Sequence, residues 1–215
     1  MVRKRCAAVI AGVVATVFGF AATAQATNVS ISGGTVVDTI PQGTSGNTVL
    51  GPAGIELGGG PIYIDGTLDV LGQGARITLY DVGSESHWIN EIWMFDKTTK
   101  KRVKDKDDFY RGTTGVFVHT PFQLAMTVTQ PSGVARMGFW RRYPDPDYET
   151  VINGQSPMMM VPGYGYASIA LAYLDDANRI VTGPTDRILL LHEDGGKDRD
   201  YDDYVGILVV EPLQK

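Results

Sequence analysis

Residues 187–210 have the sequence RILLLHEDGGKDRDYDDYVGILVV, in which two apolar segments enclose an acidic loop. The apolar segments, 187–192 and 204–210, are short, rich in leucine, isoleucine and valine, and bounded by polar residues. This pattern is typical of buried β-strands. The stretch therefore predicts two core strands joined by a charged loop.

Similar short apolar segments recur along the rest of the chain and are separated by turn residues. Residues 87–95 alternate with apolar side chains on both faces, which predicts a central strand buried on both sides. Asp65-Gly66 predicts a turn within 61–70. The other expected strands are 77–79, 116–119, 122–129, 134–141 and 166–174. No window of twelve residues has a helical period with caps, so we expect an all-β fold, an antiparallel β-sandwich of jelly-roll or Ig-like type.

The first 26 residues have the order of a secretory signal peptide. Arg3, Lys4 and Arg5 precede an apolar run over 7–24, and the small-x-small site Ala24-Gln25-Ala26 follows. The alternative, a membrane anchor, is less compatible with the alanine and glycine content of the run and its small-residue end. Cleavage of 26 of the 215 residues would leave 189, change the formal net charge from −5 to −8 and remove the single cysteine. We expect a secreted, extracellular protein with no membrane span in the mature form, stabilised by something other than disulfides.

The expected mature chain divides at about residue 60. Residues 27–60 are rich in glycine, threonine and serine, whereas 61–215 carry the sandwich pattern. The N-terminal segment is either a flexible leader or a source of edge strands at 36–37 and 55–57. Its composition predicts few core contacts.

The acidic loop is the main candidate for chemistry. Its six carboxylates lie within eleven residues and are opposed by only two cations; they are Glu193, Asp194, Asp198, Asp200, Asp202 and Asp203. Like charges this close repel one another unless a cation neutralises them. Calcium, which takes six to eight oxygen ligands, fits this requirement. The alternative is a solvated acidic hairpin tip. An EF-hand is excluded because Asp203 and Val209 occupy the positions that require glycine and glutamate.

The order Glu193-Asp194, then Asp198-Arg199-Asp200-Tyr201-Asp202-Asp203 before the last strand, resembles a bacterial family of secreted β-sandwich domains of unknown function. The signature of that family is roughly E-D-x(n)-D-R-D-[FY]-[ND]-D, and its members are often exported or surface proteins. The resemblance implies a calcium ion held by Glu193, Asp194, Asp198, Asp200 and Asp203. Asp202 stands where the family often has asparagine. The resemblance implies no catalytic activity.

Two further segments are candidates for binding. Residues 97–106 contain six cations, which predicts either a site for an anionic polymer such as acidic polysaccharide or a solvated hairpin tip. Residues 141–148 and 164–166 combine tyrosine with charge, which is typical either of a structural loop or of a sugar-binding loop. Asp145 and Asp147 are the one candidate glycosidase pair, a less favoured interpretation.

The remaining sequence argues against an enzyme. It contains no G-x-S-x-G elbow, no H-E-x-x-H metal motif and no P-loop. The negative net charge argues against nucleic acid as a partner. We therefore expect a secreted, calcium-stabilised sandwich with a structural or adhesive role, whose partner is an extracellular polysaccharide or a surface protein. The alternatives are a calcium-dependent carbohydrate-binding module and, less favoured, an extracellular polysaccharide-active enzyme.

Overall fold

The protein was analysed as a computed structural model that describes residues 27–40, 47–85, 90–105, 116–141, 148–152, 167–193 and 200–214. All regular structure in these residues is β-structure, with fifteen strands in three sheets. Every strand pairs with its neighbours in antiparallel fashion. Among the described residues, no helix has the length and hydropathy needed to cross a membrane. The expected signal peptide, 1–26, lies outside the described residues.

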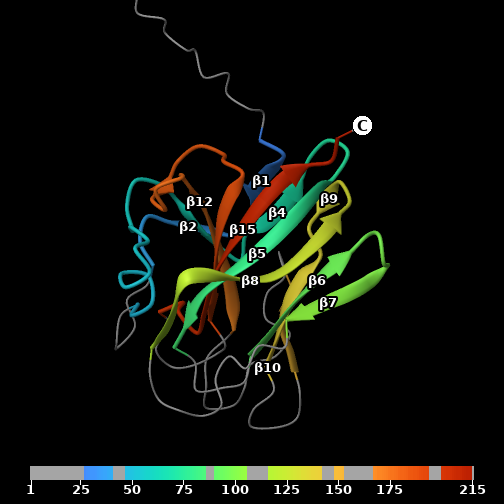
Figure 1. The fold of residues 1–215 in the computed structure, drawn as a ribbon. Coiled ribbons are helices and arrows are strands. Elements are labelled where there is room, and N and C mark those ends of the chain that lie inside the picture. Colours follow the sequence, from blue (N-terminus) through green and yellow to red (C-terminus); the bar gives the residue numbers. More distant parts are fainter. Residues whose placement is uncertain are drawn as a thin grey trace, which may run out of the picture.

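The largest sheet has eight strands in the order β2-β3-β12-β14-β15-β5-β8, with β13 paired to β12. These are β2 (Thr35–Val37), β3 (Ile62–Ile64), β12 (Ser168–Leu174), β13 (Ile180–Val181), β14 (Arg187–Glu193), β15 (Tyr204–Pro212), β5 (Ala75–Ser84) and β8 (Phe117–Gln130). The two strands predicted at 187–192 and 204–210 are confirmed as β14 and β15, and they pair at the centre of this sheet (Figure 1). Their continuous apolar sequence follows from burial on both faces.

Two smaller sheets lie against one face of the large sheet. The first has the order β1-β4-β9 and the second the order β11-β10-β6-β7. Their strands are β1 (Val29–Ser32), β4 (Thr67–Val70), β9 (Gly133–Val134), β11 (Tyr148–Ile152), β10 (Met137–Arg141), β6 (Asn90–Asp96) and β7 (Lys101–Asp105). The predicted central strand at 87–95 corresponds to β6, in which Ile92 and Met94 are buried in the core and Trp93, on the other face, is only 2% exposed.

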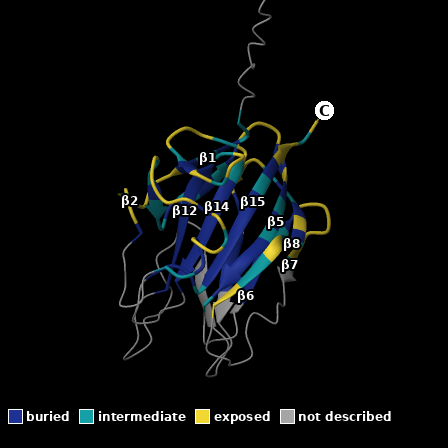
Figure 2. Cartoon of the chain, turned by 60° about the vertical axis from the view of Figure 1, so that its left-hand side comes forward, coloured by how far each residue is buried: buried dark blue, intermediate teal, exposed yellow. Residues whose placement is uncertain are grey.

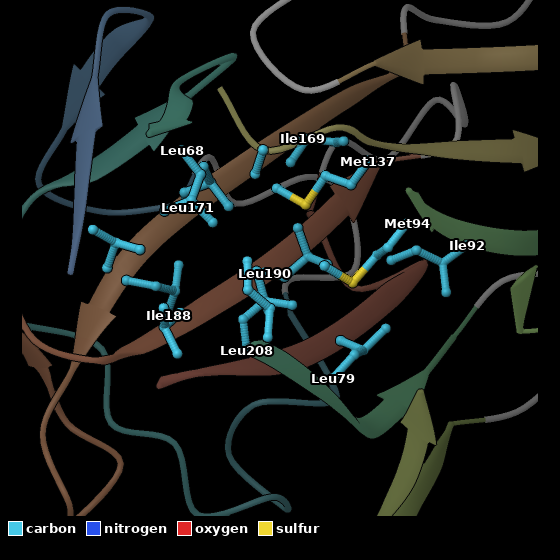
Figure 3. Packing of buried hydrophobic residues seen from close by; sticks show 14 of the residues in the cluster. Leu68, Leu79, Ile92, Met94, Met137, Ile169, Leu171, Ile188, Leu190 and Leu208 are labelled. Atoms are coloured by element: carbon cyan, nitrogen blue, oxygen red, sulfur yellow. The ribbon is translucent and has the colours of Figure 1, made fainter. Parts of the chain in front are cut away.

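The main core fills the space between the large sheet and the two small ones. Leu190 and Leu208 from the large sheet meet Leu68 of β4 and Met94 of β6 in one buried cluster (Figure 3). Apolar side chains from two facing sheets thus interdigitate, which is the defining feature of a sandwich. The prediction of an all-β, antiparallel β-sandwich is confirmed.

A second apolar cluster lies on the opposite face of the large sheet. Leu189, Leu191 and Ile207 of its central strands pack there with Val49 and Leu50 of the N-terminal segment. The central strands are therefore buried on both faces (Figure 2). The expectation that residues 27–60 make few core contacts is wrong: the segment supplies β1, β2 and six buried apolar residues, Val29, Ile31, Ile40, Val49, Leu50 and Ile55. Its glycines shape turns, while its sparse apolar residues cover a sheet face that would otherwise meet water.

The turn predicted at Asp65-Gly66 is present, but the strands on its two sides do not pair with each other. β3 joins the large sheet and β4 joins the β1-β4-β9 sheet, so these two residues form a corner between layers. The Asp65 N–H donates to the carbonyl of Ile169 at 2.7 Å, which fixes the corner to β12. A Cβ at Gly66 would lie 2.7 Å from the Cβ of Tyr63, so the corner requires glycine.

Candidate metal centre

The candidate site lies where β5 ends and the chain approaches β15. The Ser84 hydroxyl donates to the Asp203 carbonyl at 2.7 Å, and the Glu85 N–H donates to the Asp202 carbonyl at 2.8 Å. These bonds hold two segments far apart in sequence side by side. They extend the β5–β15 pairing, which includes a register shift between Val205 and Gly206.

Three carboxylates converge at this point. Oxygen atoms of Glu85, Asp200 and Asp202 all lie within 4.8 Å of one another. Asp200 is 2% exposed and Asp202 1%, whereas Glu85 is half-buried. Burying two carboxylates this deeply costs free energy unless they are hydrogen-bonded or paired with a cation.

The N-terminal segment completes the site through Asn47 and Thr48. The Thr48 N–H donates to Oδ2 of Asp202 at 2.5 Å. The Thr48 hydroxyl lies 2.7 Å from a Glu85 oxygen and 2.9 Å from Oδ2 of Asp202; having one proton, it can donate to only one of them at a time. The Asn47 amide donates to the Asp200 carbonyl at 3.0 Å. Residues 47–48 therefore contact all three residues of the carboxylate cluster.

Tyr201 fixes the backbone between the two aspartates. It has a left-handed φ of 61°, a conformation that is uncommon for a residue with a side chain. Its ring is buried in the second apolar cluster, and its phenol accepts a 2.6 Å hydrogen bond from the Ser168 hydroxyl. The packing of Tyr201 thus compensates for an unfavourable backbone and anchors Asp200 and Asp202.

The electrostatics of the cluster favour a bound proton or a cation. Burial, followed by the neighbouring Asp200 carboxyl, raises the pKa of Asp202 to about 8, although hydrogen bonds from Thr48 act in the opposite direction. At neutral pH the cluster therefore holds a proton or requires a cation. All its donor atoms are oxygens, which suit a hard cation better than a metal that prefers nitrogen or sulfur. The cluster could hold a metal ion.

The five residues that the family resemblance implied as ligands have different positions. Asp200 belongs to the carboxylate cluster. Glu193, at the end of β14, is buried and Asp203 is half-buried, and neither belongs to the three-carboxylate group. Asp194 and Asp198 lie outside the described residues.

Two members of the cluster were missed by sequence reasoning. Asp202 is one of the six carboxylates of the acidic loop, but it was not among the five ligands that the resemblance implied. Glu85 lies beyond the end of an apolar strand, and no local pattern distinguishes it from any exposed glutamate. Only the pairing of β5 with β15 brings it to the site.

Comparison with known proteins finds no matching family model, no matching curated protein and no matching solved structure. The class that the fold and the site define is therefore an all-β sandwich with a buried acidic cluster that could hold a metal ion. Of the candidate sugar-binding segment 141–148, Arg141 ends β10 and Tyr148 begins β11, while the residues between them, including Asp145 and Asp147, lie outside the described residues, as do 164–166.

Proposed function

We propose that the protein is an exported, calcium-stabilised β-sandwich with a structural or adhesive role at the cell surface or in the extracellular matrix, and that it acts without catalysis. The observation that carries this proposal is the convergence of Glu85, Asp200 and Asp202, two of them almost fully buried. An ion at this point would join the end of β5, the approach to β15 and residues 47–48.

The chemistry of the site favours calcium among the hard cations. Calcium takes six to eight oxygens at about 2.3–2.6 Å with flexible geometry, whereas magnesium demands a tight octahedron and keeps its waters. The cluster combines carboxylates with the Thr48 hydroxyl, and the sequence places Asp194 and Asp198 shortly before Asp200. In a mature chain without cysteine, such an ion would take the place of a disulfide as a link between distant segments.

The structural role is favoured over a calcium-dependent carbohydrate-binding module by the aromatic residues next to the cluster. Such a module needs exposed aromatic rings beside the ion. Tyr201 and Tyr204 are the nearest tyrosines in sequence, and they are only 7% and 1% exposed. Tyr201 bonds to Ser168, and the Tyr204 hydroxyl donates to Asp81 at 2.5 Å. Both rings therefore serve the core.

Thermal unfolding in chelator and in excess calcium tests the proposal. Binding to the folded form alone adds about 2.7 kcal/mol at a hundredfold excess over Kd, which corresponds to roughly 5–10 °C in Tm for a domain of this size. Asp202→Asn should remove most of that increase, because it replaces a charged ligand with a neutral one.

The matched control is Asp176→Asn, which changes an exposed carboxylate in the turn after β12. It should keep the full calcium response. Magnesium should raise Tm less than calcium does. Equal Tm values of the unsubstituted protein in chelator and in calcium would contradict the proposal.

A further inference from the structure

The β6–β7 hairpin presents a group of exposed cations. Lys97 and Lys100 lie in its turn, and Lys101 and Arg102 begin β7; all four are exposed. Within the described part of the chain, the three lysines make no ion pair. In a protein with a net charge of −5, this is a local positive surface.

The hairpin turn is held rigidly. The Asp96 carboxylate accepts hydrogen bonds from the backbone N–H groups of Thr99 at 2.6 Å and Thr129 at 2.9 Å. The Lys97 N–H in turn donates to the Thr129 carbonyl at 2.6 Å. The turn is therefore fixed to β8, and the lysines project from a defined position.

Two arginines extend the positive surface across the outer face of the β11-β10-β6-β7 sheet. The guanidinium of Arg102 lies 4.0 Å from the centre of the Trp93 ring, and that of Arg136 lies 4.6 Å from the Phe95 ring. Trp93 lies against Gly138, where a Cβ would come within 2.6 Å of the indole. Aromatic contacts of this kind restrict the guanidinium planes, and a restricted guanidinium binds carboxylate or sulfate groups at a lower entropic cost.

From these contacts we propose that the hairpin and Arg136 form a binding surface for an anionic polysaccharide. The other exposed residues of the turn, Thr98 and Thr99, are small and polar. Residues 97–102 contain no aromatic or large aliphatic side chain to insert into a membrane. Trp93 is 2% exposed and lies under Arg102, so it offers no platform for a nucleic-acid base.

This surface is separate from the acidic cluster. Thr129, which holds the hairpin, pairs with Arg76 near the start of β5, whereas Glu85 follows the other end of that strand. The nine residue steps from Arg76 to Glu85 correspond to roughly 30 Å of strand. Polysaccharide binding should therefore persist in chelator. The inference deepens the proposed adhesive role and rests on it for the extracellular setting in which the polymer is met.

The test is retention of the full chain on immobilised dextran sulfate, with uncharged dextran as the matched surface. Lys97→Gln/Lys101→Gln removes two charges from the hairpin, and the control Arg179→Gln/Lys215→Gln removes two elsewhere. We expect retention on dextran sulfate only. The hairpin variant should bind on the order of fivefold more weakly at about 50 mM salt, because exposed ion pairs are individually weak. The control should match the unsubstituted protein.

Equal weakening by the two double variants, or equal retention on dextran, would overturn the proposal. Tighter binding to duplex DNA or to anionic phosphatidylserine vesicles than to dextran sulfate would overturn the polysaccharide assignment. Running each measurement in chelator and in calcium separates the two proposals. Retention that is unaffected by chelator, with no calcium effect on Tm, would remove the calcium proposal alone.

Discussion

The acidic cluster and the cationic hairpin both bring like charges together, but the cluster is mostly buried and the hairpin is exposed to water. Glu85, Asp200 and Asp202 come from distant segments and are held together in a mostly buried site, where burial and the neighbouring Asp200 carboxyl raise the pKa of Asp202 and favour a bound cation. The hairpin cations are neighbours in sequence and remain in water, where their repulsion is screened. The acidic cluster forms only when the whole fold brings its three residues together, whereas the hairpin cations are brought together by one turn. Changes near the cluster should therefore be felt globally and changes in the hairpin locally.

The largest effect is expected from Leu50→Ala, two residues after Thr48. Leu50 is 1% exposed in the second apolar cluster. Truncating a buried leucine costs about 2–5 kcal/mol, and here it also loosens the segment that bonds to Asp202. Chemical denaturation should show this loss, together with weaker calcium stabilisation. Leu57→Ala, at a 39% exposed position, is the control; an equal loss there would contradict the central role of residues 47–50.

The next effect is a pH dependence confined to the calcium-free protein. The folded-state pKa of Asp202 is about 8, above its ordinary value of 3.8. A raised acid pKa contributes stability that is fully present below about pH 4 and is lost as pH rises to 8. In chelator, Tm should fall by several degrees between pH 5 and 8. Asp202→Asn should flatten this profile, and a profile that Asp202→Asn leaves unchanged would show that another group is responsible.

A smaller effect is expected from Asp96→Asn at the base of the hairpin. Burial acts to raise the pKa of Asp96, but hydrogen bonds from Thr99 and Thr129 outweigh it and lower the pKa. The carboxylate therefore stabilises the fold above about pH 4, and this contribution is lost as pH falls through the lowered pKa. Loss of the charge should cost about 1.5–3 kcal/mol at neutral pH. Calcium stabilisation should be unchanged; a reduced calcium response would mean that the two regions are coupled.

The smallest effect is expected from Lys100→Gly, and it should be favourable for stability. Lys100 has a left-handed φ of 58°, which glycine adopts without steric cost. Relief of the left-handed strain is worth about 1–2 kcal/mol, and the larger entropy of glycine in the unfolded chain offsets about 0.5–1 kcal/mol of it. The net gain should be about 0.5 kcal/mol, or roughly 1–2 °C in Tm, while binding to dextran sulfate weakens. A fall in Tm would show that the lysine side chain contributes packing to the turn.

The sequence predicts the strands of this protein better than their arrangement. β14 and β15 are predicted directly from their apolar segments, because a short continuous apolar run between polar loops is typical of a buried strand. The corner at Asp65-Gly66 has the residues of a hairpin turn, yet β3 and β4 belong to different sheets, and the corner is bonded to Ile169 of β12. β7 was not predicted because it lies in a charged segment: Lys101 and Arg102 are exposed, while Val103 packs against the core.

The sequence predicts that the candidate site is acidic and needs a cation, but it does not predict which residues form the site. Repulsion within 193–203 is visible in the sequence and indicates a need for a cation. The partners from outside the loop, Glu85 and Thr48, are ordinary surface residue types in polar or glycine-rich sequence. Their role depends on strand pairing across more than a hundred residues, which no local pattern encodes.

The place of β15 in the large sheet has a consequence for the order of folding. This strand, residues 204–212, lies between β14 and β5, so β5 has no partner on that side until the last strand is available. A chain emerging from its N-terminus can pair β5 with β8, but it leaves two open strand edges where β15 belongs. Closure of the large sheet therefore waits until β15 is available, and the same step carries Asp200 and Asp202 to Glu85.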